Sequence, residues 1–192
     1  DLCYAVRGNS EFHAIFGGSG CHIVHPSDTA PALMALEAQV VIASPRGTRQ
    51  VSMDNFFVRP ATDPTRETVL EPGEIVTELL LPPVKSGQRS SYRKVRARRS
   101  WDFALAGMAL KLVTTRDGVI EEAGVVFSGV APVPWRSLGA QRALMGERLT
   151  QDVIRTTAQI AVESADPMRN NAYKVPLLQG VVEAELERWA AE

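Results

Sequence analysis

The sequence predicts an α+β fold in which a small antiparallel sheet is followed by a helical C-terminal region. Three segments, 91–97, 103–114 and 119–130, have the apolar pattern of strands. Arg116-Asp-Gly, between the last two, is typical of a hairpin turn. After Pro132 the apolar residues recur at helical spacing instead. We therefore expect the second half to be a three-stranded antiparallel sheet backed by a three-helix bundle.

The first half begins with a glycine-rich segment. Glycines between residues 17 and 20 permit backbone angles that other residues avoid, so residues 1–25 are expected to form turns and loops. A helix is predicted to begin at Ser27 or Asp28, because either side chain can cap it and Pro31 suits its first turn. Beyond that helix we expect strands at 39–43, 49–53 and 74–81, and a short turn or a single helical turn at 54–57.

The second half is predicted to contain helices at 137–145, 151–165 and 176–191. Between the two halves runs the polar connector Lys85-Ser-Gly-Gln-Arg-Ser-Ser, which follows a pair of prolines. This connector is the best candidate boundary, so we expect two domains, 1–85 and 86–192.

Composition excludes several classes of protein. Of the 192 residues 45% are hydrophobic and 22% charged, which is ordinary for a folded chain and not for a disordered one. The formal net charge of −1 provides no global positive field for nucleic acid. No apolar run reaches the roughly 20 residues of a membrane span, and no secretory leader is seen. Because the chain starts at Asp1 rather than Met, we expect a fragment, a processed chain or one that lacks an N-terminal part.

The common catalytic motifs are absent from this sequence. It has no Gly-x-Ser-x-Gly elbow, no Walker loop and no His-Glu-x-x-His pair. Cys21, His22 and His25 lie close enough in sequence to suggest zinc, but their spacing matches no standard zinc module. A small hydrolase or zinc enzyme is therefore a poorly supported hypothesis, and we expect no catalytic residue in this chain.

Two polar patterns have two interpretations each. On a strand, Lys94, Arg96 and Arg98 would share one face, which could bind phosphate or carboxylate or could be a solvated edge or subunit contact. Ser27-Asp28, at a helix start, could contact a ligand or could simply cap the helix.

Six segments in linear order carry a family resemblance. They are Phe12-His-Ala-Ile-Phe-Gly-Gly, the stretch from Cys21-His-Ile-Val-His-Pro-Ser-Asp to Glu37-Ala, Leu70-Glu-Pro-Gly-Glu-Ile-Val-Thr, Tyr92-Arg-Lys-Val-Arg-Ala-Arg, Gly129-Val-Ala-Pro-Val-Pro-Trp-Arg and Asn171-Ala-Tyr-Lys-Val. Together they closely resemble the C-terminal two-thirds of the FAD-binding (medium) subunit of the molybdenum hydroxylases. That family includes xanthine dehydrogenase, aldehyde oxidoreductase and carbon monoxide dehydrogenase.

The resemblance covers nearly all of the chain and implies its architecture. Residues 1–85 resemble the tail of a PCMH-type FAD-binding domain, and residues 86–192 resemble the C-terminal domain of the carbon monoxide dehydrogenase flavoprotein. In that family the flavin pyrophosphate is held mainly by glycine-rich loops in an earlier part of the chain, which has no counterpart in this sequence.

The resemblance also implies which residues meet the flavin. Asp28 matches an acidic residue that contacts FAD, Val76 an apolar residue that packs near the ring, and Lys94 a lysine near the isoalloxazine. Ser27 is a further candidate. A cation such as Lys94 would stabilise the negative charge that develops on a reduced ring. The alternative is that Asp28 only caps a helix and Lys94 is only an exposed strand residue.

The two cysteines gain an interpretation from the same resemblance. The aldehyde oxidoreductase and 4-hydroxybenzoyl-CoA reductase branches carry a [4Fe-4S] cluster in this subunit, and four thiolates hold such a cluster. Cys3 and Cys21 fall where the last two ligands of the aldehyde oxidoreductase branch would lie. Alternatively, both are free or buried cysteines.

The leading hypothesis is thus an electron-transfer flavoprotein subunit of an oxidoreductase. A partner subunit with the molybdenum cofactor would oxidise an aldehyde or heterocycle, and electrons would pass through iron–sulfur centres, including the [2Fe-2S] subunit, to FAD and on to an acceptor. The alternative is an assembly or docking module of such a hetero-oligomer, without flavin. We expect a cytoplasmic location, or a periplasmic one if a partner subunit carries the export signal.

Overall fold

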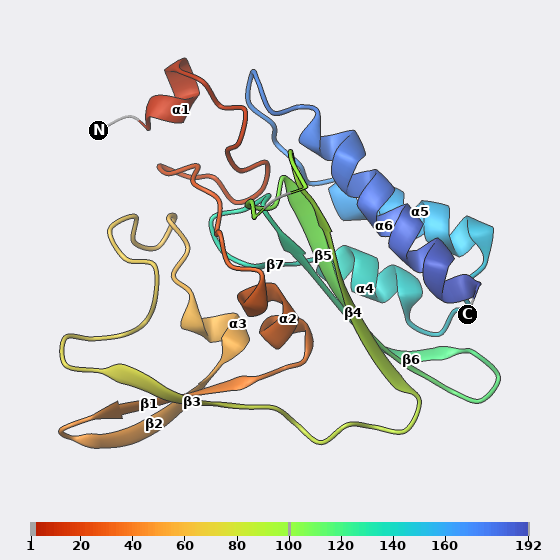
Figure 1. Ribbon diagram of the computed structural model, residues 1–192, viewed down its shortest axis with the longest axis horizontal. Coiled ribbons are helices and arrows are strands. Elements are labelled where there is room, and N and C mark those ends of the chain that lie inside the picture. The colour runs from red at the N-terminus through yellow and green to blue at the C-terminus, as the bar shows by residue number, and fades with distance from the viewer. Residues whose placement is uncertain (1–2, 100, 192) are drawn as a thin grey trace.

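The computed structural model describes residues 3–99 and 101–191, and these form two antiparallel sheets with most of the helices around the second (Figure 1). The first sheet has the order β2-β1-β3 and the second the order β4-β5-β6-β7. The strands are β1 (Gln39–Ser44), β2 (Gly47–Ser52), β3 (Ile75–Leu80), β4 (Gln88–Val95), β5 (Ala106–Thr114), β6 (Ile120–Ser128) and β7 (Trp135–Arg136). The helices are α1 (Tyr4–Arg7), α2 (Thr29–Ala35), α3 (Met53–Phe56), α4 (Leu138–Leu144), α5 (Gln151–Val162) and α6 (Lys174–Ala190).

The second sheet confirms the expected α+β class. Its three long strands pair in sequence order, and the turn around Arg116-Asp-Gly joins β5 to β6. In the described chain a fourth, two-residue strand, β7, extends the sheet beyond the three strands expected. Its Trp135 and Arg136 follow a proline-rich stretch, whose missing N–H groups make a strand hard to foresee from the sequence.

Both faces of the second sheet are covered. Side chains alternate along β5, so Met108, Leu110 and Leu112 pack against α4, α5 and α6, whereas Ala109 points to the opposite face. On that opposite face Ala109 and Val126 pack with α2, α3 and β1. The central sheet is therefore a middle layer, with the helical region on one side and the first half of the chain on the other.

The core of each half is completed by residues of the other half. Ile15 and Phe16, from the glycine-rich N-terminal segment, belong to the core formed by β5, β6 and the C-terminal helices. Arg136 of β7 adds a polar link, since its guanidinium pairs with Asp54 of α3 and donates to the carbonyl of Met34 in α2 at 2.5 Å. The two halves are thus held together by shared apolar packing and by a bidentate ion pair.

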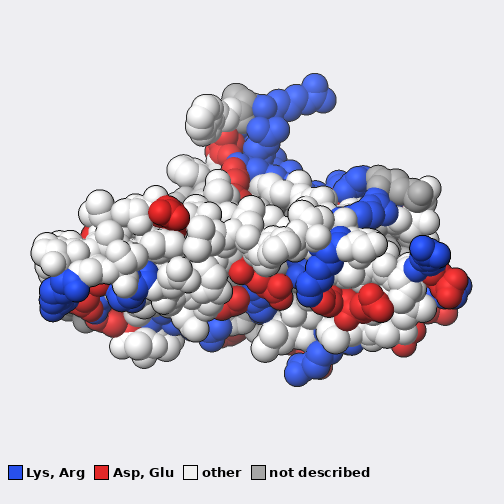
Figure 2. All heavy atoms as spheres, turned by 90° about the horizontal axis from the view of Figure 1, so that it is seen from below, with Lys and Arg blue, Asp and Glu red and all other residues white. Residues whose placement is uncertain are grey.

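Strand β3 forms one edge of the first sheet and leaves large apolar side chains exposed. Ile75, Leu79 and the following Leu81 are each about half exposed. Figure 2, seen from below the view of Figure 1, shows broad uncharged surface on its left part between groups of charged side chains.

No helix in the described residues is both long enough and apolar enough to traverse a lipid bilayer.

Candidate functional site

Asp28 lies at the centre of a polar network that joins three segments of the chain. Its Oδ2 accepts a hydrogen bond from Lys94 Nζ at 2.6 Å, and its Oδ1 accepts one from the Tyr92 hydroxyl at 2.8 Å. The same Tyr92 oxygen is 2.8 Å from Ser128 Oγ. We call these four residues, Asp28, Tyr92, Lys94 and Ser128, the Asp28 network.

The geometry of the second sheet sets the positions of these side chains. Tyr92 and Lys94 are two residues apart on β4, so they share one face of the sheet. Gly107 on β5 pairs with Lys94 on one side and with Ser128 on the other. A Cβ atom at Gly107 would lie 2.4 Å from Ser128 Oγ and 3.3 Å from the Tyr92 oxygen. The absence of a side chain at this position therefore leaves room for the network.

The charges of the network differ in their contact with solvent. The Asp28 side chain is 44% exposed and the Lys94 side chain 19% exposed, so one carboxylate faces outward beside a partly covered ammonium. Burial raises the pKa of Tyr92 above its ordinary value, and the neighbouring Asp28 carboxylate raises it further. Tyr92 therefore stays protonated at neutral pH and donates its hydrogen to Asp28, whose carboxylate remains partly exposed to solvent.

Ser27, rather than Asp28, caps helix α2. The Ser27 hydroxyl accepts the N–H of Ala30 at 3.0 Å, whereas Asp28 makes no side-chain cap bond. The Asp28 side chain therefore pairs with Lys94 instead of capping the helix, and the Lys94 side chain is ion-paired and only 19% exposed. Ser27 and Val76 line one small apolar hollow of about 210 Å³, so the structure brings these two predicted residues together.

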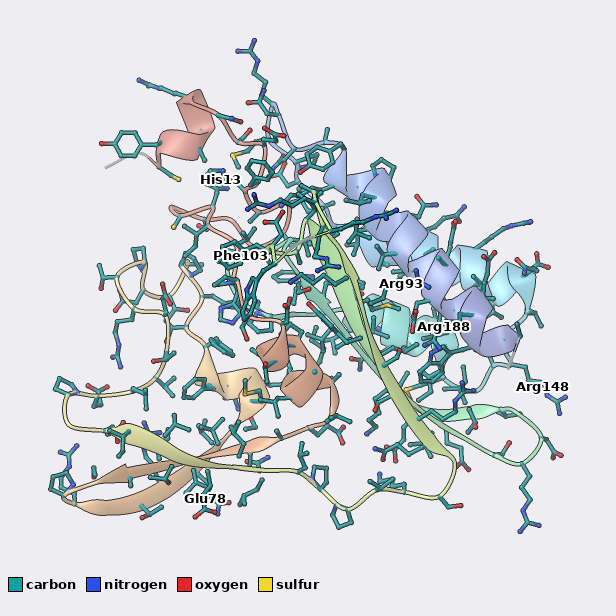
Figure 3. All side chains as sticks on the ribbon, in the orientation of Figure 1. His13, Glu78, Arg93, Phe103, Arg148 and Arg188 are labelled. Carbon is teal, nitrogen blue, oxygen red and sulfur yellow. The ribbon has the colours of Figure 1, made fainter. Side chains whose placement is uncertain are left out.

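A larger hollow adjoins the same stretch of chain. It measures about 660 Å³ and is mostly apolar, and its lining includes His25, Pro26, Ala97 and Phe103. Figure 3 labels Phe103, which lies between the N-terminal segment and the end of β4. His25 packs edge-on against Phe57, and its buried Nε2 has no hydrogen-bond partner among the described residues. Sequence reasoning missed this hollow because its walls come from two loops about 70 positions apart.

The expected basic face is only partly present. Strand β4 ends at Val95, so Arg96 and Arg98 lie beyond it and do not continue the face that carries Lys94. Arg98 instead pairs with Asp102 in the following loop. The sequence pattern predicts a strand as far as Ala97, and the correction leaves Lys94 in the Asp28 network without the two arginines.

The cysteines lie in the N-terminal segment, and both are free and half-buried. Cys3 lines a surface hollow of about 500 Å³ together with His13. The backbone of Cys21 pairs with that of Ser19 in an isolated antiparallel β-bridge. Within residues 3–99 and 101–191, no three histidine, cysteine or acidic side chains are grouped so that they could hold a metal ion. The zinc alternative at Cys21, His22 and His25 is therefore not supported.

Two family models match the chain, one in each half. Residues 13–84 match the FAD binding domain in molybdopterin dehydrogenase, and residues 90–187 match the CO dehydrogenase flavoprotein C-terminal domain.

Similar proteins agree with these matches. The chain is 35% identical to the aldehyde oxidoreductase FAD-binding subunit PaoB of Escherichia coli (strain K12), over 99% of this chain and 57% of that protein. It is 31% identical to the carbon monoxide dehydrogenase medium chain of Hydrogenophaga pseudoflava, over 91% of this chain and 60% of that one. The solved carbon monoxide dehydrogenase from Hydrogenophaga pseudoflava superposes with a TM-score of 0.70 at 25% identity, over 93% of this chain and 58% of that chain. This chain thus spans less than two thirds of the length of these relatives, and it belongs to the family of FAD-binding medium subunits of the molybdenum hydroxylases.

Proposed function

We propose that this chain is part of the FAD-binding electron-transfer subunit of a molybdenum-dependent oxidoreductase of the aldehyde or xanthine type. In that role it passes electrons from iron–sulfur centres through FAD to an acceptor. The single observation that carries the proposal is the Asp28 network, in which a carboxylate and a lysine expected at the flavin make a direct 2.6 Å contact. The match of residues 13–84 to an FAD-binding domain supports it.

The residues present fit a flavin. The larger hollow has the apolar and aromatic lining that a planar ring system favours, and the buried Nε2 of His25 lacks a partner among the described residues. The hollow includes Pro26, two positions before the half-exposed Asp28. Ser27, which precedes Asp28 in the sequence, lines the smaller hollow together with Val76. We propose that Ser27, Asp28, Val76 and Lys94 contact the flavin, with Ser27 and Val76 doing so from the smaller hollow.

The chemistry divides between the cofactor and the chain. Bound FAD would supply the capacity to accept and release electrons. Lys94 would hold a positive charge beside the ring, which favours the reduced, more negative state. Asp28 would fix the position of the Lys94 ammonium through its Oδ2. On its exposed side the same carboxylate would accept a hydrogen bond from an N–H or O–H group of the ligand. Tyr92 would orient Asp28 by donating to Oδ1.

The partner subunits and the metal centres are part of the same proposal. We propose that this chain assembles with a molybdenum-cofactor subunit and a [2Fe-2S] subunit, because its relatives are described as a medium chain and as an FAD-binding subunit. We further propose that Cys3 and Cys21 supply two of the four thiolates of a [4Fe-4S] cluster. The division at residues 85 and 86 is proposed as the domain boundary, since the matches to the two family models end at 84 and begin at 90.

The test is a visible absorption spectrum of the protein purified with its natural partners, before and after dithionite. The proposal expects flavin bands that bleach on reduction, above a broad iron–sulfur shoulder. Replacing Cys3 and Cys21 by serine should diminish the shoulder if they are cluster ligands. A spectrum without flavin bands would contradict the proposal and would favour the assembly-module alternative.

A further inference from the structure

Lys174, the first residue of α6, is buried and is not one of the residues proposed to contact the flavin. It is 1% exposed, and both acceptors of its ammonium are main-chain carbonyls, those of Phe12 at 2.9 Å and Gly129 at 2.7 Å. Burial lowers its pKa to about 8. An apolar side chain of similar volume would avoid this desolvation cost. The presence of a buried lysine here is therefore best explained by its hydrogen bonds to the two carbonyls.

The Phe12 carbonyl belongs to a segment that is held at several points by the residues just before α6. We call Asn170, Asn171, Tyr173 and Lys174 the clamp. Apart from those of Lys174, its contacts are Asn170 with Ser10, Asn171 with the carbonyls of His13 and Ala14, and Tyr173 with the carbonyl of Glu11. The clamp therefore fixes residues 10–14, which lead directly into the glycine-rich segment at 17–20.

The Gly129 carbonyl belongs to the other side of the same junction. Gly129 has a φ of +72°, and a Cβ there would lie 2.5 Å from the Ala104 carbonyl oxygen, so its backbone path is tightly constrained. The next residue, Val130, accepts the N–H groups of Ile15 and Phe16 at 2.8 and 3.1 Å. The preceding residue is Ser128 of the Asp28 network, so the carbonyl that Lys174 binds belongs to the residue next to that network.

We propose that Lys174 is a positioning residue for the flavin site. By holding the carbonyls of Phe12 and Gly129 at once, it fixes the glycine-rich segment relative to Ser128, and through Ser128 relative to Tyr92, Asp28 and Lys94. The C-terminal helical region would thus set the geometry of a site whose flavin contacts lie outside it. This inference rests on the proposed function, in which the Asp28 network faces FAD.

The experiment compares two buried lysines in the protein purified with its partners. Lys174→Met removes the positioning ammonium. Lys111→Met is the matched control, because Lys111 is also buried but pairs with Glu37 and Glu122 in another part of the sheet. We expect both variants to lose thermal stability. Only Lys174→Met should weaken FAD binding, by roughly tenfold or more in dissociation constant, and change the visible circular dichroism of the bound flavin.

Each outcome decides the question. An equal change in FAD affinity in both variants would overturn the inference, because the effect would then follow general destabilisation. Unchanged affinity and circular dichroism in folded Lys174→Met would overturn it too. If Lys174→Met does not fold, Lys174→Gln, which keeps an N–H donor on a shorter side chain, takes its place with the same expectation. A wild-type complex that carries no FAD would instead overturn the proposed function, together with this inference.

Discussion

Tyr92 shows how one side chain connects distant parts of the candidate site. Its hydroxyl donates to Asp28, which precedes α2, and contacts Ser128 at the end of β6. Because burial raises the pKa of Tyr92, the hydroxyl keeps its proton and remains a donor at neutral pH. The Tyr92 hydroxyl therefore joins Asp28 to two strands of the second sheet, beside the direct contact that Lys94 makes with Asp28.

Gly107 provides a test at the same scale. We expect Gly107→Ala to destabilise the protein by about 1–3 kcal/mol, because the new Cβ would lie 2.4 Å from Ser128 Oγ and 2.9 Å from the Arg93 carbonyl oxygen. The matched control is Gly180→Ala in α6, where a Cβ meets nothing within 4 Å and alanine favours the helix. Urea unfolding of both variants measures the difference, and equal stabilities would show that the space at Gly107 is not needed.

The sequence could identify the residues of the site better than their roles. The Ser-Asp pattern at a helix start predicts that one of the two caps α2, and only the structure shows that Ser27 does so while Asp28 turns to Lys94. Tyr92 and Ser128 were missed because they lie 36 residues apart in sequence and meet only when β4 and β6 flank β5.

At the scale of elements, the contact between α6 and β4 is built on one buried acid. Glu185 accepts hydrogen bonds from Ser91 Oγ and Arg93 Nε of β4, at 2.5 and 2.8 Å. It also accepts hydrogen bonds from two residues of its own helix, the Arg188 guanidinium and the Trp189 ring N–H. Figure 3 labels Arg93 and Arg188, which come from the two sides of this contact. Burial would by itself raise the pKa of Glu185, but the hydrogen bonds from Arg188, Ser91 and Arg93 outweigh it and lower the pKa to about 2.

This acid predicts a pH dependence of stability. The pKa in the folded state, about 2, lies below the ordinary value of 4.5, so the unfolded state binds more protons between these values. The contribution of Glu185 is therefore complete above pH 4.5 and is lost as the pH falls towards 2, with an upper size of about 3 kcal/mol. The free energy of unfolding of the wild type should fall faster than that of Glu185→Gln across this range. Parallel curves would contradict the prediction, and the exposed Glu187→Gln serves as the matched control.

The elements themselves were largely predictable, and their limits were less so. Turn residues such as Arg116-Asp-Gly and the helical spacing after residue 150 carry local information that the structure confirms. Strand β4 begins at Gln88 and ends at Val95, shifted towards the N-terminus from the expected 91–97, because its ends are set by pairing with β5. Helix α1 was not expected in a segment whose composition favours loops.

The whole molecule is organised around a sheet that both halves of the chain cover. Ala109 and Val126 of the second half complete the core of the first, and Ile15 and Phe16 of the first half complete the core of the second. This mutual packing could not be predicted from periodicity, because Ile15 and Phe16 lie in a loop. The proposed boundary at residues 85 and 86 therefore separates two parts of the chain that match different family models. These two parts nevertheless share apolar cores.

Shared cores predict cooperative unfolding. We expect one calorimetric transition for this chain, with a calorimetric enthalpy that equals the van't Hoff enthalpy, because neither half can open without exposing residues of the other. Val126→Ala, which removes packing between the halves, should shift that entire transition to lower temperature. Two separate transitions, with only one of them moved by Val126→Ala, would show that the halves fold independently.

The most direct test of the flavin account is the reduction midpoint potential of FAD in complexes that contain Lys94→Met. The matched control is Lys85→Met, which removes a lysine that pairs with Glu122 outside the site. The account predicts that Lys94→Met lowers the potential by roughly 30 mV or more, which corresponds to about 1.4 kcal/mol for two electrons, because a positive charge beside the reduced ring is lost. Lys85→Met should leave it unchanged. Equal potentials in the wild type and Lys94→Met, with FAD fully bound, would contradict the placement of the Asp28 network at the flavin.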